Sequence, residues 1–262
     1  MSCIIKRTLG YFMTKKQRRS FMRELKRGKL DGNDNQYFEE ANQVISLIQD
    51  YTTPRIDAPL KALNDAQSRY IKSIHNNIIT LSCGPAGAGK TYVCGSLAAE
   101  ALANGKTDKI IVTRPVQEAG ESLGFLPGEL EDKFAPYFQP FKDVLEERLG
   151  KGQVQGLVKA GRIEASPLAY MRGRSFKNCW IILDEAQNCT VTQMKLFLTR
   201  IGENCTVVVN GDVSQRDVNG TCGLSDAMRR LANINGVNII NFTKADIVRS
   251  GMVQEVVEAY ED

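Results

Sequence analysis

Residues 84 to 91 read Gly84-Pro-Ala-Gly87-Ala-Gly89-Lys90-Thr91, which is a complete GxxxxGK[ST] phosphate loop. The apolar run 78–83 precedes the loop, and a helix-compatible stretch to Ala103 follows it. In such a loop the glycines turn backbone N–H groups toward phosphate oxygens, and the helix N-terminus and the lysine add positive charge. The pattern therefore predicts a strand, a loop and a helix that bind a nucleoside triphosphate. The predicted nucleotide-binding residues are Gly84, Pro85, Ala86, Gly87, Ala88, Gly89, Lys90, Thr91 and Tyr92.

A second motif, Trp180-Ile-Ile-Leu-Asp184-Glu185-Ala-Gln187, places two acids directly after a continuous apolar run. Such a run is typical of a strand buried on both faces of a parallel sheet, and open α/β sheets bind ligands at the carboxyl ends of their strands. We expect Asp184 and Thr91 to hold a hydrated Mg²⁺ ion, and Glu185 to orient or deprotonate the attacking water. An acidic pair after a strand can also be a helix N-cap, but its combination with a phosphate loop favours hydrolysis.

A third polar cluster, Asn-Gly211-Asp212-Val-Ser-Gln215, follows the apolar run 205–209. This strand end is expected to face the terminal phosphate, where Gln215 would sense that group. Gly-Asp alone is a common turn, so the meaning of the cluster depends on its position beside the other motifs. Ahead of the first strand, the amide of Gln67 is placed to read the edge of an adenine base.

Predicted strands and helices alternate along the chain, which indicates an α/β fold with a mostly parallel sheet flanked by helices. Residues 114–136 are rich in Gly and Pro without a clean hydrophobic period, so a long surface loop is expected there. Asn64 is the expected N-cap of the helix predicted at 63–74. Besides the elements of the motifs, we predict strands at 109–113 and 236–242 and helices at 63–74 and 137–149.

The composition is that of an ordinary soluble globular protein, with 262 residues of which 42% are hydrophobic and 24% charged. No apolar run approaches the roughly 20 residues of a membrane span, and the N-terminal basic residues are not followed by the apolar segment of a secretory signal. The seven cysteines are odd in number and form no CxxC pair, so we expect reduced core thiols rather than a disulfide or zinc site. These features predict a cytoplasmic protein that contacts no membrane.

The N-terminal 30 residues carry ten Lys or Arg residues against one acid, whereas the whole chain has a net charge of only +4. Such a segment is suited to a polyanion, most simply nucleic acid, because Lys and Arg neutralise phosphates and release counterions. A solvated helix face or a flexible tail is the alternative explanation. We divide the chain into a basic helical N-terminal arm at 1–35 and a nucleotide-binding domain at 36–262.

From residue 63 to about 260 the chain resembles the PhoH-like ATPases, in the motifs GPAGAGKT, TRPVxEAGESLGFLPGEL, PLAYMRGR, IILDEAQN, QMKLFLTRIG and NGDVSQxD. It is also similar to the first RecA-like motor domain of superfamily 1 helicases, whose motifs Q, I, Ia, II and III match Gln67, the phosphate loop, 113–115, 184–187 and 211–215. The resemblance implies a RecA-like P-loop fold that hydrolyses ATP with Mg²⁺ and is coupled to single-stranded nucleic acid, RNA in preference to DNA. It also implies the catalytic residues Lys90, Glu185 and Gln215.

Only 47 residues follow Gln215, fewer than the roughly 150 of a second motor domain. A RecA-like ATP site is normally completed by an arginine from a neighbouring domain. We therefore expect another subunit to supply this arginine in a homo-oligomer, which by the resemblance is a hexameric ring. Arg200 and Arg249 are the candidate arginine fingers, and a surface salt bridge is the alternative role of each.

Three arginines are candidate contacts for the phosphates of a bound single strand, namely Arg114, Arg172 and Arg174. A guanidinium group suits phosphate recognition, but arginines in loops equally serve as structural ties. Both roles stay open for each of them.

Two other functions use the same phosphate loop. A small-molecule kinase would need an acceptor pocket and lid arginines, and the second and third motifs argue against it. A nucleotide-gated oligomeric scaffold, with slow hydrolysis and no unwinding, is the alternative to a helicase-like motor.

Overall fold

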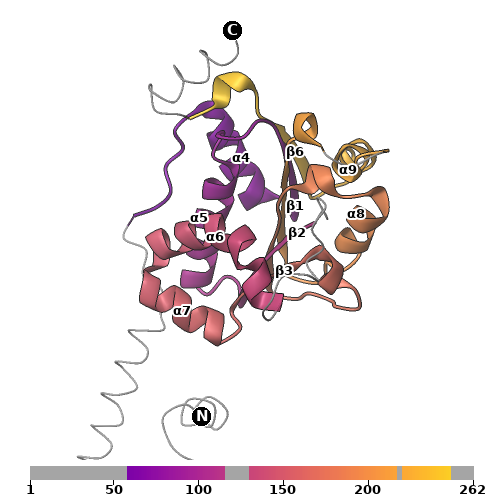
Figure 1. Ribbon diagram of the computed structural model, residues 1–262. Coiled ribbons are helices and arrows are strands. Elements are labelled where there is room, and N and C mark those ends of the chain that lie inside the picture. Colours follow the sequence, from indigo (N-terminus) through magenta and orange to yellow (C-terminus); the bar gives the residue numbers. More distant parts are fainter. Residues whose placement is uncertain (1–57, 116–129, 217–219, 249–262) are drawn as a thin grey trace, which may run out of the picture. The chain divides into compact units, whose positions relative to one another are not determined.

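The computed structural model describes residues 58–115, 130–216 and 220–248 (Figure 1). They belong to one compact unit, Tyr51–Asp262. The basic arm predicted at 1–35 and its boundary with the domain lie outside the described residues, and both stay predictions. No helix in the described ranges is long and apolar enough to cross a bilayer.

A six-stranded sheet forms the centre of this part of the chain, in the order β3-β2-β4-β5-β1-β6. All of its neighbouring strands are parallel. Helices alternate with the strands, which confirms the predicted α/β fold with a mostly parallel sheet flanked by helices. The strands are β1 (Ile79–Cys83), β2 (Lys109–Arg114), β3 (Ile163–Pro167), β4 (Cys179–Leu183), β5 (Thr206–Gly211) and β6 (Val237–Asn241).

Helices cover both faces of the sheet (Figure 1). One face carries α4 (Asp65–Asn76), α5 (Lys90–Ala103), α6 (Leu130–Leu149) and α7 (Lys151–Lys159). The other face carries α8 (Val191–Leu198) and α9 (Gly223–Leu231). Short 3₁₀ turns follow the carboxyl ends of four strands, as η2 (Leu168–Met171), η3 (Ala186–Asn188), η4 (Val213–Gln215) and η5 (Lys244–Asp246).

Side chains of the central strands alternate between two core clusters, one on each face of the sheet. On β4, Ile182 packs in the cluster of α4–α7, whereas Ile181 and Leu183 pack in the cluster of α8 and α9. Every residue of β4 is buried, which explains the continuous apolar run in the sequence. Because helices bury both faces of the sheet, the polar motifs lie at the ends of the strands, along one edge of the sheet.

Helix α6 begins at Leu130 and not at Tyr137, so part of the predicted loop is helical. The predicted start was wrong because Pro136, a residue that usually ends a helix, lies inside this one, as Pro140 does. Buried Phe141 and Leu145 join the core cluster that includes α5, and this burial offsets the hydrogen bonds that the prolines remove. The remainder of the predicted loop, 116–129, lies outside the described residues.

Strand β3 was not predicted, because its sequence of Ile, Glu, Ala, Ser and Pro has neither alternation nor an apolar run. It pairs with β2 alone, at the edge of the sheet, where a terminal proline is tolerated. The other predicted strands, and the helix predicted at 63–74, agree with the structure within two residues. Asn64 caps α4 as expected, since its side chain accepts a hydrogen bond from the N–H of Gln67 at 2.8 Å.

The six cysteines in the described ranges are free and buried, as predicted. Burial raises the pKa of the Cys94 thiol and of the Cys189 thiol to about 12. Thiols with such a high pKa are poor nucleophiles and metal ligands at neutral pH. These cysteines are therefore core residues.

Candidate nucleotide site

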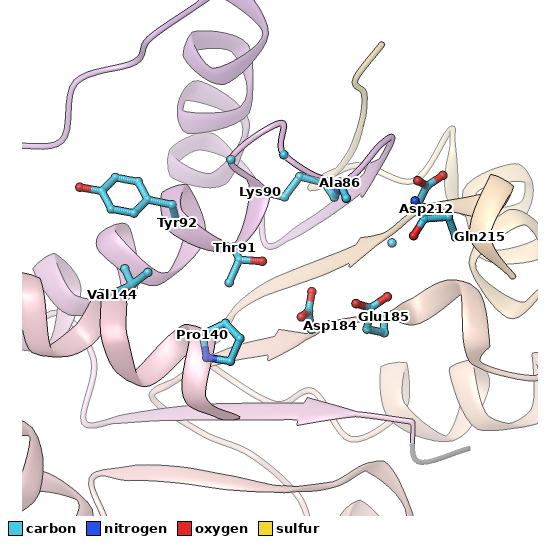
Figure 2. Close-up of a pocket in the computed structure, with 13 residues that line it drawn as sticks. Ala86, Lys90, Thr91, Tyr92, Pro140, Val144, Asp184, Glu185, Asp212 and Gln215 are labelled. Carbon is cyan, nitrogen blue, oxygen red and sulfur yellow. The ribbon is translucent and has the colours of Figure 1, made fainter. Parts of the chain in front are cut away.

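The three predicted motifs meet at the carboxyl edge of the sheet, after the neighbouring strands β4, β5 and β1. The register places Cys83 of β1 beside Gly211 of β5, and Leu183 of β4 beside Val209 of β5. The loops that follow share one cavity of ≈ 380 Å³, within the size range of small-molecule sites. The cavity is lined by Ala86, Gly87, Gly89, Lys90, Thr91, Tyr92, Pro140, Val144, Asp184, Glu185, Gly211, Asp212 and Gln215 (Figure 2).

The phosphate loop depends on glycine at several positions. Gly87 and Gly89 both have φ of 82°, a left-handed conformation that glycine adopts without strain. A Cβ atom on Gly84 would lie 2.5 Å from the carbonyl oxygen and the Cβ of Phe242, so only glycine fits against the end of β6. The loop is held from this side by the N–H of Phe242, which donates to the Cys83 carbonyl at 2.7 Å, and by the N–H of Val248, which donates to the Gly87 carbonyl at 3.0 Å.

Gln67 lies behind the phosphate loop and does not line the cavity. Its Nε2 donates to the carbonyl of Ala88 at 3.2 Å, and its Oε1 accepts from the N–H of Leu63 at 2.9 Å. A Cβ on Gly89 would lie 2.5 Å from this Nε2. These contacts make Gln67 a support of the loop, whereas its reading of adenine stays a prediction. Gly84, Pro85 and Ala88, also predicted to bind nucleotide, shape the loop without lining the cavity.

Lys90 begins α5 and lies over the loop. Its Nζ donates to the carbonyl oxygens of Gly84 and Pro85, at 2.6 and 2.8 Å. Burial lowers the pKa of Lys90, and the negative charges of Asp212 and Asp184 oppose this shift. The ammonium group is therefore positioned by the loop at the acidic side of the cavity, where a phosphate would meet it.

Asp184 and Thr91 both line the cavity and offer oxygen ligands of the kind that Mg²⁺ prefers. Figure 2 shows Thr91 and Asp184 on neighbouring parts of the wall. Burial and the charge of Glu185 raise the pKa of Asp184, Arg114 opposes them, and the resulting pKa is about 6. A cation would relieve this unfavourable burial of negative charge. The residues thus fit the predicted magnesium site, where Asp184 and Thr91 would hold the ion.

Glu185 has an unusual backbone for a residue other than glycine, with φ of 52° and ψ of 38°. Such left-handed residues cost free energy and concentrate at functional sites. The turn places the Glu185 side chain next to Asp184 on the cavity wall, opposite Asp212 and Gln215 (Figure 2). The arrangement is suited to a carboxylate that orients water at a terminal phosphate.

Gln187 and Asp212 were not predicted as site residues. The Nε2 of Gln187 donates to Oε2 of Glu185 at 2.6 Å, and its Oε1 accepts from the N–H of Asp212 at 3.0 Å. Gln187 is 2% exposed. Gln187 closes the motif matched at 184–187, but the motif did not assign it a role, because that role depends on the approach of β5 to β4.

The opposite end of the cavity has an apolar wall made by Tyr92 of α5 and by Pro140 and Val144 of α6 (Figure 2). The hydroxyl of Tyr92 donates to Oε1 of Glu147 at 2.8 Å, which ties the ring to α6. The cavity therefore has a charged end suited to phosphates and an apolar end suited to the rest of a nucleotide.

Arg114 ends β2 beside the predicted magnesium site. Its guanidinium group stacks over the ring of Tyr137 at 4.8 Å, and its charge acts on Asp184. The structure thus places Arg114 near the acids, while its predicted contact with nucleic acid stays a prediction.

Arg172 and Arg174 differ in their surroundings. Arg172 is exposed, as a contact for a ligand requires. Both terminal nitrogens of Arg174 contact the carboxylate of Glu164, one of them at 2.9 Å, and its guanidinium group stacks on Phe176 at 5.1 Å. Lys109 contacts the same carboxylate at 2.5 Å. The structure favours the alternative role of Arg174, a structural tie.

We expect Glu164→Gln to lower the free energy of unfolding by about 1–2 kcal/mol at pH 7. Burial acts to raise the pKa of Glu164, but Arg174 and Lys109 outweigh it and hold the pKa at about 2. Because this pKa lies below the ordinary value, the ion pair stabilises at neutral pH and the stabilisation is lost as pH falls from about 4.5 toward 2. Urea unfolding at pH 7 and pH 4 measures the difference between the two proteins, which should be smaller at pH 4.

Glu203→Gln is the matched control, because Glu203 and its partner Lys177 are 80% and 66% exposed. Its effect should stay below about 0.5 kcal/mol. Equal losses for the two variants at pH 7 would contradict the role given to Glu164.

The two candidate arginine fingers stay predictions. Arg249 lies outside the described residues. Arg200 follows α8, and its carbonyl accepts from the N–H of Phe176 at 3.0 Å. It does not line the cavity of its own chain, as is expected of a residue that acts in another subunit.

A protein-family model described as PhoH-like protein matches residues 59–261. The chain is 50% identical over 210 residues to Protein PhoH of Escherichia coli strain K12, across 79% of this chain and 59% of that protein. It is 41% identical over 231 residues to a PhoH-like protein of Bacillus subtilis strain 168, across 87% and 71% of the two chains. A solved structure of Pif1 helicase from Candida albicans aligns with 76% of this chain and 43% of its own, at 14% identity and a TM-score of 0.37.

Proposed function

The chain belongs to the PhoH-like family, and we propose that it binds ATP with Mg²⁺ and hydrolyses it. One observation carries the proposal, namely that the phosphate loop, the acids after β4 and the polar residues after β5 line a single cavity. The chain spans 59% of the length of the Escherichia coli relative.

Each part of the cavity has a task in this proposal. The loop amides and Lys90 bind the phosphates and stabilise the charge that develops on the transferred group. Asp184 and Thr91 would hold Mg²⁺, which when bound neutralises phosphate charge. Glu185 orients the attacking water and accepts its proton, and Gln215 senses the terminal phosphate.

We further propose that hydrolysis is coupled to single-stranded nucleic acid, RNA in preference to DNA. The support is the resemblance to helicase motifs, the exposed Arg172 and the excess of Lys and Arg in residues 1–30. In a homo-oligomer that forms a hexameric ring, a neighbouring subunit would supply an arginine to this cavity. The free cysteines support a reducing, cytoplasmic location.

The coupling predicts that single-stranded RNA raises the ATPase rate of the purified full chain, and that single-stranded DNA raises it less. The reason is that bound nucleic acid should favour the arrangement of the site that hydrolyses ATP. Phosphate release measured with and without each nucleic acid tests this. Arg172→Ala should weaken the stimulation without changing the basal rate. A rate that is indifferent to both strands, together with ATP-dependent assembly, would favour the nucleotide-gated scaffold.

A further inference from the structure

A continuous set of hydrogen bonds links the predicted phosphate sensor to the predicted water-orienting residue. The N–H of Gln215 donates to the carbonyl of Asp212 at 3.0 Å. The N–H of Asp212 donates to Oε1 of Gln187 at 3.0 Å, and Nε2 of Gln187 donates to Oε2 of Glu185 at 2.6 Å. The single side chain that joins the two strand ends in this set is the amide of Gln187.

Asp212 and the backbone of Gln187 are both held in place by further hydrogen bonds. On the β5 side, Oδ1 of Asp212 accepts from the N–H and the hydroxyl of Ser214, at 3.0 and 2.6 Å, so the turn η4 is braced. On the β4 side, the carbonyl of Gln187 accepts from the thiol of Cys222 at 3.4 Å. Because these residues are held by hydrogen bonds, a displacement of η4 would move the Gln187 amide.

Gly211 shows how closely β5 approaches this amide. A Cβ at position 211 would lie 2.9 Å from Oε1 and 3.0 Å from the backbone nitrogen of Gln187. Gln187 itself is almost completely buried, and both ends of its amide are used within the protein. Burying an amide is favourable only when its hydrogen bonds are made, so the amide holds one orientation.

We propose that Gln187 is a positioning residue, which orients the Glu185 carboxylate and couples it to the turn that carries Gln215. Its hydrogen bond to Oε2 of Glu185 fixes the orientation of the carboxylate. The backbone of Glu185 is itself held in the left-handed conformation. A shift of η4 on contact of Gln215 with a terminal phosphate would pass through Asp212 to this amide. This inference rests on the proposed ATP hydrolysis, and it adds that Gln187 connects the turn of Gln215 to the carboxylate of Glu185.

The test is the substitution Gln187→Met, which has a similar length but lacks both hydrogen bonds, measured by steady-state ATPase kinetics of the full chain. We expect kcat to fall about 10- to 100-fold, as for other losses of precise positioning, while KM for ATP changes less than about twofold. Gln187→Asn keeps an amide that is too short to reach both partners, and it should show the same split between kcat and KM. Gln187→Asn is the variant to measure if Gln187→Met does not fold.

A double-mutant cycle separates positioning from a general structural role. Because Gln187 acts through Glu185, Gln187→Met should have little further effect on single-turnover hydrolysis in a Glu185→Gln background. Equal losses in both backgrounds, parallel losses in kcat and ATP affinity, or unchanged kinetics of both variants would overturn the role of Gln187. A wild-type chain that does not hydrolyse ATP would instead overturn the proposed function together with this inference.

Discussion

Glu185→Gln is expected to lower kcat for ATP hydrolysis by about 10²- to 10⁴-fold, the usual contribution of a general base. The amide has nearly the same shape as the carboxylate but cannot accept the proton of the attacking water. Binding of ATP should persist, because the phosphate loop, Lys90 and Thr91 are unchanged. Phosphate release and equilibrium binding of a fluorescent ATP analogue measure the two effects separately.

Glu203→Gln serves as the control for this experiment, since Glu203 is exposed and does not line the cavity. Its kcat should equal that of the wild type. If Glu185→Gln retained full turnover, the acid after β4 would not activate water, and another group would have to do so.

Lys90→Ala should weaken both binding and turnover, unlike Glu185→Gln. Loss of a charged hydrogen-bond donor costs about 1.5–3 kcal/mol, so ATP affinity should fall about 10- to 100-fold. Hydrolysis should fall about 10³-fold, because the ammonium also stabilises charge in the transition state. The same binding and phosphate-release assays give both values.

The matched control is Lys195→Ala, a lysine that is exposed on α8. In the described part of the chain the Nζ of Lys90 donates hydrogen bonds only to the carbonyls of Gly84 and Pro85, so the folded structure should survive in Lys90→Ala. An unchanged thermal midpoint with lost ATP binding supports the site. Normal binding and turnover in Lys90→Ala would show that the nucleotide binds elsewhere.

The sequence predicted the parts of the site that consist of consecutive residues. The phosphate loop and the acids after β4 are local patterns, and the position of each in the fold is set by the strand that directly precedes it. Gln187 could not be predicted in this way, because its partners Glu185 and Asp212 come together only when β4 and β5 pair.

The errors in the fold have a similar cause. Strand β3 is stabilised by its pairing with β2 rather than by its own hydrophobic pattern. Helix α6 continues through Pro136 and Pro140, where the burial of Phe141 and Leu145 outweighs local propensity. In both cases tertiary contacts decide the structure, and a single sequence does not display them.

Release of phosphate from ATP by the purified full chain, in Mg²⁺ and then in excess chelator, tests the central claim most directly. We predict steady release in Mg²⁺ that stops when the metal is removed and is absent in Lys90→Ala. A chain that neither binds ATP nor releases phosphate in Mg²⁺ would contradict the proposed function of this cavity.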